Sequence, residues 1–376
     1  MKRYAAFEPP EYVSWTRDDD ACRAFRATLS SDPDRERVIA ALTEAQLLGM
    51  YRGLLRNRLT DIALKRMVRQ GVISKAWLGT GEEAATIGPV HALRRQPAGT
   101  PAGKSDVVGP MIRNSGACHE MGMPIADILR AYMATGDSPN AGRDGHYGAL
   151  DTGVLPPISH VGDIVPVITG IALSFKMMKS DRVALTWIGD GSTKAGVSHE
   201  GLNFAAVQRA PAIFIIQNNQ VALGTRLSQH HLENDGAFAN WPRAYGMWGG
   251  VFDGNNVLDG YALTSLAADR CRRGEGPALL VAETFRMGGH ATHDEAEARR
   301  TFDASLFTSW GKRDPIALFE EYLADEGISR DVLSGIESEV EAEVERAQEE
   351  AIASRQANMP KPQNALDGVY AAPPRK

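Results

Sequence analysis

The sequence of 376 residues is poor in cysteine and has no surplus of basic residues. Its three cysteines, Cys22, Cys118 and Cys271, are widely separated and form no CxxC pair, which argues against a disulfide framework and favours a reducing compartment. Lys and Arg total 41 against 47 Asp and Glu, a net charge of -6, so the positive charge that binds a phosphate backbone is missing. Nucleic acid is therefore not an expected partner.

Long hydrophobic runs and targeting segments are also missing. The most apolar run, Val165 to Phe175, contains Pro, Thr, Gly and Ser and is far shorter than the roughly 18 residues that a membrane span needs. The N-terminal residues MKRYAAFEPPEY lack the apolar segment that is typical of a secretory signal. We therefore expect a cytoplasmic protein that is not inserted into a membrane. Hydrophobic residues at 43% and charged residues at 23% exclude a disordered chain and favour a globular enzyme.

Pattern and composition divide the chain into four segments. Residues 1–40 mix proline with charge runs and show no sustained period, so we expect an extension that lies over the surface. Residues 41–315 form the main α/β domain, 316–357 form C-terminal helices, and 358–376 form a tail. The acidic residues between 331 and 357 are interpreted as a solvated helix face.

Helical and strand patterns alternate within the main domain. Apolar positions at helical spacing start after Thr43 and continue to about Gln70, where Gly71 ends the helix. Residues 95–106, rich in Pro and Gly, are expected to be a surface connection. Further along, three buried strands are predicted at 183–188, 212–216 and 278–282, with helices between them at 198–209 and 257–273. Strands separated by helices imply right-handed crossovers and a parallel sheet.

Polar clusters directly follow two of these strands. Gly189-Asp190-Gly191-Ser192 follows the first, and Asn218-Asn219 follows the second. Because ligands bind outside the carboxyl ends of parallel strands, both clusters are expected at one edge of the sheet. The Asp190 carboxylate, the Asn219 side-chain oxygen and the Val221 carbonyl would supply three hard oxygen ligands, which favour Mg²⁺ or Ca²⁺. Mg²⁺ leaves positions for phosphate oxygens, so the expected ligand is a diphosphate, to which the glycines allow a close backbone approach.

The other motifs in the sequence do not indicate a functional site. The segment Gly99 to Ser105 ends in Gly-Lys-Ser, but position 98 is Ala, so the spacing of a phosphate-binding loop is not met. His290 and His293 have no third ligand at zinc spacing, and His230-His231 is interpreted as a solvated loop pair. Neither a Gly-x-Ser-x-Gly motif nor a GxGxxG motif after a strand is present. The hypotheses of acyl transfer by a serine and of an NAD-dependent dehydrogenase therefore lose support.

The Gly-Asp-Gly and Asn-Asn clusters at this spacing resemble the thiamine diphosphate motif. Their flanks resemble the α subunit of the E1 component of 2-oxo acid dehydrogenase complexes, from about Leu47 to Pro315. The matching segments, in order, are Gly81-Glu-Glu-Ala84, Pro166-Val-Ile-Thr-Gly-Ile-Ala-Leu173, Glu200-Gly-Leu-Asn-Phe-Ala-Ala206, Ala222-Leu-Gly-Thr225, Asp253-Gly254, Gly276-Pro277 and Phe285-Arg-Met-Gly-Gly-His290. The resemblance implies a parallel-sheet thiamine diphosphate-binding fold with helices on both faces.

The resemblance also assigns roles to individual residues. It implies that Asp190, Asn219 and the Val221 carbonyl hold Mg²⁺, and that His290 is the catalytic histidine facing the cofactor and substrate. The implied cofactor-binding residues are Arg113, Ser159, Val161, Gly189, Asp190, Gly191, Ser192, Asn219 and Arg286. Two arginines on a diphosphate are physically sensible, since charge-assisted bidentate bonds are strong.

Several of these residues have a structural alternative. Arg113 is otherwise a surface arginine, Arg286 an ion-pair partner within the fold, and His290 a structural histidine. Glu200 is either support for the site or an acid near a helix start. Trp77 lies where pyruvate enzymes have a substrate-side histidine, and core packing is an equal alternative.

The sequence departs from the family at three places. Ile112 replaces the tyrosine before the arginine, so one cofactor contact is lost or replaced. Ala291 and His293 lie in the segment where mitochondrial relatives have serines that are phosphorylated. Control by phosphorylation of this segment is therefore not expected. Residues 140–147, NAGRDGHY, replace a glycine-rich loop, which bears on substrate choice.

The implied activity is oxidative decarboxylation of a 2-oxo acid, branched-chain or pyruvate, with acyl transfer to the lipoyl domain of an E2 acyltransferase. The cofactors would be thiamine diphosphate and Mg²⁺, and the glutamate that bonds the aminopyrimidine would come from an E1 β subunit in an α2β2 assembly. An acetoin-type E1 α subunit and a non-catalytic thiamine-fold subunit are the alternatives.

Overall fold

A computed structural model describes residues 1–95, 104–143, 145–232 and 236–366. Most of the predicted connection at 95–106, the Gly99 loop and the end of the tail lie outside the described residues. The strands are β1 (Val107–Gly109), β2 (Ala184–Gly189), β3 (Ala212–Asn218), β4 (Val221–Ala222), β5 (Thr225–Arg226), β6 (Trp248–Asp253) and β7 (Ala278–Glu283). The α-helices are α1 (Pro10–Val13), α2 (Asp19–Leu29), α3 (Pro33–Ala40), α4 (Glu44–Arg69), α5 (Glu83–His91), α6 (Ser115–Glu120), α7 (Ile125–Tyr132), α8 (Ile164–Met177), α9 (Gly196–Gln208), α10 (Leu227–His230), α11 (Trp241–Ala244), α12 (Val257–Arg272), α13 (Glu295–Thr301), α14 (Ala304–Gly311), α15 (Pro315–Asp325) and α16 (Arg330–Ala357). Two 3₁₀ turns are η1 (Gly191–Lys194) and η2 (Pro362–Leu366).

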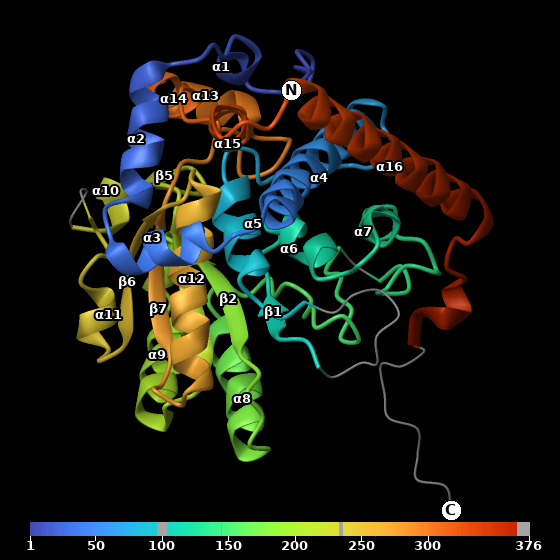
Figure 1. The fold of residues 1–376 in the computed structure, drawn as a ribbon. Coiled ribbons are helices and arrows are strands. Elements are labelled where there is room, and N and C mark those ends of the chain that lie inside the picture. Colours follow the sequence, from blue (N-terminus) through green and yellow to red (C-terminus); the bar gives the residue numbers. More distant parts are fainter. Residues whose placement is uncertain (96–103, 144, 233–235, 367–376) are drawn as a thin grey trace, which may run out of the picture.

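A five-stranded parallel sheet with the order β1-β2-β3-β7-β6 lies at the centre of the molecule (Figure 1). The three predicted strands are confirmed as β2, β3 and β7, and the predicted helices between them as α9 and α12. Two short or glycine-containing strands, β1 and β6, were not predicted. The fold class, an α/β parallel sheet between helices, is confirmed.

Helices cover both faces of the sheet, as the alternation of side chains along each strand requires. On β2, Leu185 and Trp187 pack with residues of α5, α6 and α12. Ala184 and Ile188 point to the opposite face and pack with residues of α8 and α9. Every residue of β2 and β3 is buried, so the two faces together form a core that fixes the strand ends in space.

The long helix α4 begins as the sequence predicts. The Thr43 side chain accepts the Gln46 backbone N–H, and the Gln46 side chain accepts the Thr43 backbone N–H, which is a capping box. After the helix, Gly71 adopts a φ of 71°, a left-handed conformation that favours glycine. The α4 helix packs against α16, which runs beside it (Figure 1).

The N-terminal segment contributes buried side chains as well as lying over the surface. It forms α1, α2 and α3, and Tyr12 is fully buried. Its Glu8 carboxylate accepts a hydrogen bond from Arg58, whose guanidinium also bonds Glu83 and Asp314. All four side chains of this cluster are inaccessible to solvent. The segment is therefore part of the packed structure, while the proposed boundaries 1–40, 41–315, 316–357 and 358–376 stay predictions.

The acidic face predicted for the C-terminal helix is confirmed in part. Glu339 is exposed, but Glu337 of α16 is buried and accepts the backbone N–H of Lys2. Burial raises the pKa of Glu337. No helix within the described residues has both the length and the apolar character needed to cross a bilayer.

Candidate active site

A cavity of about 750 Å³ lies where β1 and β2 end. Almost all of the predicted site residues line it, namely Arg113, Ser159, Val161, Gly189, Asp190, Gly191, Ser192, Val221, Arg286 and His290. The remaining one, Asn219, is fully buried directly after β3 and does not face the cavity surface. The edge of the sheet thus brings together residues that are far apart in the sequence, as the positions of the strand ends predict.

The predicted metal ligands have the oxygen chemistry that a hard cation needs. Asp190 follows β2 directly and is 2% exposed. Within the described residues, its Oδ2 atom is buried and accepts no hydrogen bond. A buried carboxylate oxygen without a donor is costly unless a cation or another donor satisfies it. These atoms therefore fit a divalent cation.

Glu82, which the sequence analysis missed, fixes the orientation of the Asn219 amide. Its Oε1 atom accepts hydrogen bonds from Asn219 Nδ2 at 2.8 Å and from Gln217 Nε2 at 2.5 Å. Its Oε2 atom lies 3.5 Å from Nε of Arg113. With the nitrogen of Asn219 held by Glu82, the oxygen of the same amide accepts the Val221 backbone N–H at 3.2 Å, and its second lone pair is the one left for the cation. The only sequence signal for Glu82 was its place in the quoted Gly81-Glu-Glu-Ala84 segment.

The two predicted glycines differ in how strictly the chain needs them. A Cβ atom on Gly191 would come within 2.7 Å of the Ala222 Cβ, so a side chain there would force the two loops apart. A Cβ on Gly189 would meet its nearest atoms, in Met111 and Ser192, only at 3.8 Å. Gly191 therefore permits the close packing of the two loops, whereas Gly189 leaves room beside the backbone.

Two buried arginines make one wall of the cavity positively charged. Arg286 is 2% exposed, and its guanidinium donates to the carbonyls of Val221, Leu223 and Gly288. Burial, reinforced by the nearby charge of Arg113, lowers the pKa of Arg286 to about 10, which still leaves it cationic at neutral pH. Both predicted arginines thus face the cavity as cations suited to an anion.

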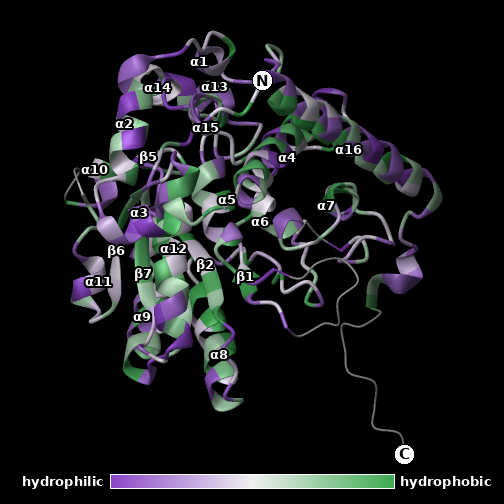
Figure 2. Cartoon of the chain, viewed as in Figure 1, coloured by the Kyte–Doolittle hydropathy of each residue, from purple (hydrophilic) through white to green (hydrophobic). Residues whose placement is uncertain are grey.

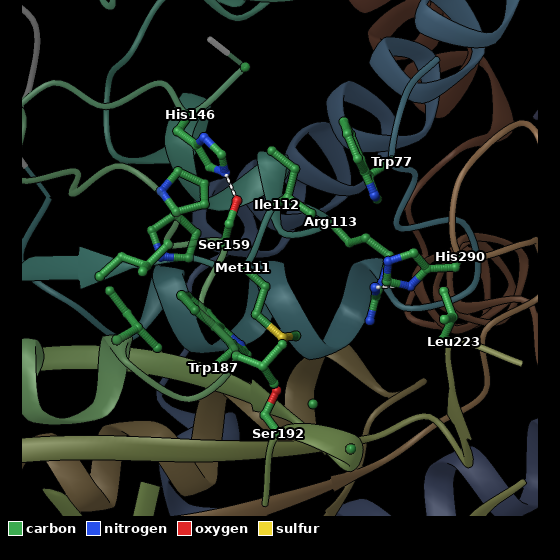
Figure 3. Close-up of a pocket in the computed structure, with 18 of the residues that line it drawn as sticks. Trp77, Met111, Ile112, Arg113, His146, Ser159, Trp187, Ser192, Leu223 and His290 are labelled. Carbon is green, nitrogen blue, oxygen red and sulfur yellow. Dashed lines mark hydrogen bonds between the residues drawn. The ribbon is translucent and has the colours of Figure 1, made fainter. Parts of the chain in front are cut away.

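His290 lies beside these arginines. Nη1 of Arg113 donates to Nδ1 of His290 at 3.4 Å, and Figure 3 shows the Arg113 side chain reaching the histidine ring. Burial and the charges of Arg113 and Arg286 lower the pKa of His290 to about 4. The ring is therefore neutral at neutral pH, and with Nδ1 accepting, the proton is on Nε2.

Asp294 holds the His290 loop and was not predicted. Its carboxylate accepts the backbone N–H groups of His290 at 3.1 Å and of Ala291 at 2.8 Å. These bonds contribute to a lowered pKa of Asp294. The loop is thus tied through its own backbone, which fixes the position of the imidazole. Ala291, which stands in the segment where mitochondrial relatives have phosphorylated serines, is buried.

The opposite side of the cavity holds the predicted pyrimidine-side residues. Ser159 and Val161 are both exposed, and Ser159 Oγ lies 2.5 Å from Nε2 of His146, which belongs to the unusual 140–147 segment (Figure 3). Trp77 is half-buried and lines the cavity, which favours the substrate-side alternative over the core. Glu200 is exposed on α9 and outside the cavity lining, which favours the helix alternative.

The interpretation of His230-His231 as a solvated loop pair is wrong. Nε2 of His230 lies 3.3 Å from Oδ2 of Asp190, and both ring nitrogens are buried. His231 is half-buried, with Nδ1 2.6 Å from Nζ of Lys194 and Nε2 2.7 Å from the Ala237 carbonyl. No local sequence pattern predicts this contact, because it arises when the loop after Val221 folds back over the Asp190 turn.

Comparison with known proteins agrees with this geometry. Residues 51–360 match the family model described as "Dehydrogenase E1 component". The chain is 32% identical over 335 residues to "2-oxoisovalerate dehydrogenase subunit alpha" of Bacillus subtilis, covering 88% of this chain and 97% of that protein. It is 32% identical to "Pyruvate dehydrogenase E1 component subunit alpha" of Acholeplasma laidlawii, over 82% of this chain and 84% of that protein. It is also 32% identical to "3-methyl-2-oxobutanoate dehydrogenase subunit alpha" of Mycobacterium tuberculosis, over 76% of this chain and 73% of that protein. The chain therefore belongs to the dehydrogenase E1 component family and is an E1 α subunit of the 2-oxo acid dehydrogenase type.

Proposed function

We propose that this α subunit binds thiamine diphosphate and Mg²⁺ and acts in the oxidative decarboxylation of a branched-chain 2-oxo acid, with pyruvate as the second candidate. The main support is one arrangement: two buried arginines and a neutral histidine face the cavity that also holds the Asp190 carboxylate. A diphosphate with a divalent cation matches that combination of charges.

In this proposal each part of the cofactor has its own residues. Asp190, Asn219 and the Val221 carbonyl would hold Mg²⁺, while Arg113, Arg286, Ser192 and the Gly189 to Gly191 turn would hold the diphosphate. Ser159 and Val161 would lie along the aminopyrimidine side. When bound, the cofactor supplies the carbanion and the electron sink that decarboxylation requires.

His290 would donate a hydrogen bond or a proton to the oxygen that is attached to the reacting carbon of the substrate. The neutral ring carries its proton on Nε2, because Arg113 donates to Nδ1. Such a ring stabilises negative charge that develops on an oxygen by donating a hydrogen bond to it. Arg113 would orient the ring in addition to binding the diphosphate, and Asp294 would keep the loop in place.

The walls of the cavity favour an aliphatic substrate side chain. Trp77, Met111, Ile112, Tyr132 and Ile158 all line the cavity. An apolar wall of this size strengthens the binding of a branched side chain, since each buried CH₂ contributes about 0.8 kcal/mol. A second carboxylate, as in 2-oxoglutarate, would lose its hydration against the same wall.

The partners we propose are an E1 β subunit in an α2β2 assembly and the lipoyl domain of an E2 acyltransferase. Support for the first is an exposed apolar surface on α8 and α9, made by Val167, Met177, Met178, Phe204 and Val207. Figure 2 shows that α8 is hydrophobic along most of its length. The surface is continuous with the cavity rim, because Val161 and Gly162 line the cavity and α8 starts two residues later. A chain seated there would reach the site and bring the glutamate that bonds the aminopyrimidine.

A cytoplasmic location stays a prediction, supported by three cysteines that are free and buried. Burial raises the pKa of Cys118 to about 12 and that of Cys271 to about 12, so both remain thiols. Thiols of this kind suit a reducing compartment.

The test is thiamine diphosphate-dependent decarboxylation by the protein purified from its own host with its co-purifying partner. Reduction of an artificial electron acceptor is followed with 2-oxoisovalerate, pyruvate, 2-oxoglutarate or acetoin. We expect the highest kcat/KM with 2-oxoisovalerate, and loss of turnover in Asp190→Asn. Preference for acetoin would reassign the substrate. Absence of turnover despite a bound β-like partner would replace the proposal by a non-catalytic subunit.

A further inference from the structure

His230 occupies an unexpected position next to the carboxylate that was predicted to bind Mg²⁺. It is the last residue of α10, and its Nε2 atom lies 3.3 Å from Oδ2 of Asp190. Within the described part of the chain, neither ring nitrogen of His230 has a hydrogen-bond partner, although both are buried. Oδ2 of Asp190 is also buried and also has no hydrogen-bond partner among the described residues. Two buried polar atoms therefore face each other without a bond between them.

This separation matches two neighbouring ligands of one metal ion. Ligands at right angles on an ion with bonds of about 2.1 Å lie about 3.0 Å apart, and tetrahedral ligands lie slightly further apart. The observed contact does not have the alignment of a direct hydrogen bond, so such a bond does not satisfy Nε2 and Oδ2 as they lie. A shared cation would satisfy both atoms at this separation.

The neighbouring cation does not occupy this position. Lys194 lies on η1 beside Asp190, but its Nζ atom is 2.6 Å from Nδ1 of His231 and lies over the rings of Phe238 and Trp241. Its ammonium group therefore contacts His231 and not His230, although it lies near enough to Asp190 to interact with its charge. The described residues contain no group of three His, Cys, Asp or Glu side chains, so an ion here needs further oxygen ligands.

We propose that His230 is a nitrogen ligand of the cation that Asp190 binds, so that the site prefers a transition metal such as Mn²⁺ or Co²⁺ to Mg²⁺. The inference rests on the proposed function, in which Asp190, the Asn219 oxygen, the Val221 carbonyl and the diphosphate supply oxygen ligands. An all-oxygen set suits Mg²⁺ and Ca²⁺, whereas an imidazole raises affinity in the order Mn²⁺, Fe²⁺, Co²⁺. Asp190 is held at the end of β2, and the 3.3 Å between its Oδ2 and Nε2 of His230 already suits two ligands of one ion.

Pulsed electron paramagnetic resonance on Mn²⁺ gives a direct readout. The full chain with its co-purified partner is loaded with Mn²⁺ and thiamine diphosphate, in protein carrying natural or ¹⁵N-labelled histidine. We expect a directly bound histidine nitrogen in the spectrum, with the coupling changed by the label. We expect the signal to be lost in His230→Gln and kept in the matched control His231→Gln, whose ring contacts Lys194 instead.

Metal affinities measured by calorimetry in the presence of thiamine diphosphate complete the test. Loss of a direct ligand should weaken Co²⁺ binding in His230→Gln by at least the roughly 10- to 100-fold that loss of a ligand's partner costs. Mg²⁺ binding, which depends on the oxygen ligands, should stay within about threefold. Bound Mn²⁺ without a histidine coupling in the unmutated protein would overturn the inference and leave the proposed function intact. If neither Mn²⁺ nor Mg²⁺ binds together with thiamine diphosphate, the proposed function fails as well.

Discussion

Replacing Glu82 by Gln changes the site at one atom and tests how the Asn219 amide is oriented. In the unmutated chain, one carboxylate oxygen of Glu82 accepts from Asn219 and Gln217, and the other lies 3.5 Å from Nε of Arg113. A glutamine amide has only one accepting oxygen. If that oxygen serves Asn219 and Gln217, its NH₂ group faces the Arg113 guanidinium. If it turns to Arg113 instead, the NH₂ group faces the NH₂ groups of both amides.

The magnitude follows from the kind of bond that is lost. Hydrogen bonds to a charged group contribute about 1.5–3 kcal/mol each, and Glu82 makes two of them while 1% exposed. One should be weakened to a neutral bond and the attraction to Arg113 should be lost. With the Asn219 oxygen no longer fixed, we expect cation and cofactor affinity to fall on the order of 10- to 100-fold, the range found when partners of metal ligands are removed.

Tryptophan fluorescence is a suitable assay, because Trp77 and Trp187 line the cavity and should respond to the bound cofactor. The control is Glu83→Gln, one residue further along. Glu83 belongs to the buried Arg58 cluster and not to the Asn219 contact. Glu83→Gln should lower Tm without changing the cofactor Kd, whereas Glu82→Gln should raise the Kd. A Kd within about twofold of the unmutated value in Glu82→Gln would refute the reasoning.

Two further predictions concern charge in the interior. His290 should titrate near pH 4 by NMR, and Arg113→Met should raise that pKa by removing one positive charge. Because the folded pKa lies below the ordinary value of about 6.5, the unfolded chain binds the proton first. The contribution of His290 to stability is therefore lost as pH falls through the window between these values, which unfolding at several pH values measures. Separately, Arg58→Met should destabilise the fold by about 3–5 kcal/mol in denaturant titrations, since it leaves Glu8, Glu83 and Asp314 buried together. An unchanged unfolding midpoint would contradict that account of the cluster.

The strands β2, β3 and β7 of the central sheet were predictable because they are short and buried along nearly their whole length. A continuous apolar run such as residues 212–216, bounded by Pro211 and Gln217, favours a strand in a parallel sheet. By contrast, β6 reads WGGVFD, and its two glycines hide the strand pattern. The N-terminal helices were missed for a different reason. Asp18 and Asp32 cap α2 and α3 through their side chains, but both lie within charge runs that suggested a solvated extension.

The predicted site residues share one property, which is that each follows a strand or sits in a motif to which the resemblance assigns a role. Asp294 and His230 do neither, and Glu82 lies in the Gly81-Glu-Glu-Ala84 segment without an assigned role. The Glu82 contact with Asn219 joins residues 137 apart in the sequence, and no local spacing encodes it. His230 depends on how the segment after Val221 returns to the Asp190 turn, which only the folded chain defines. Sequence patterns thus located the strand ends but not the groups that orient the side chains placed there.

The charges of the site imply that cation and diphosphate bind together rather than one after the other. Without ligands, the formal charges of Arg113, Arg286 and Lys194 are balanced by those of Glu82, Asp190 and Asp294, and His290 is neutral. A divalent cation alone would add charge beside two buried arginines, and a diphosphate alone would lie against the Asp190 carboxylate. Each ligand thus meets a like charge that the other compensates, and in a buried site such unbalanced charge is costly. Glu82 contributes to both halves of this balance, because it contacts Arg113 and holds Asn219, and its substitution should therefore weaken the joint binding step.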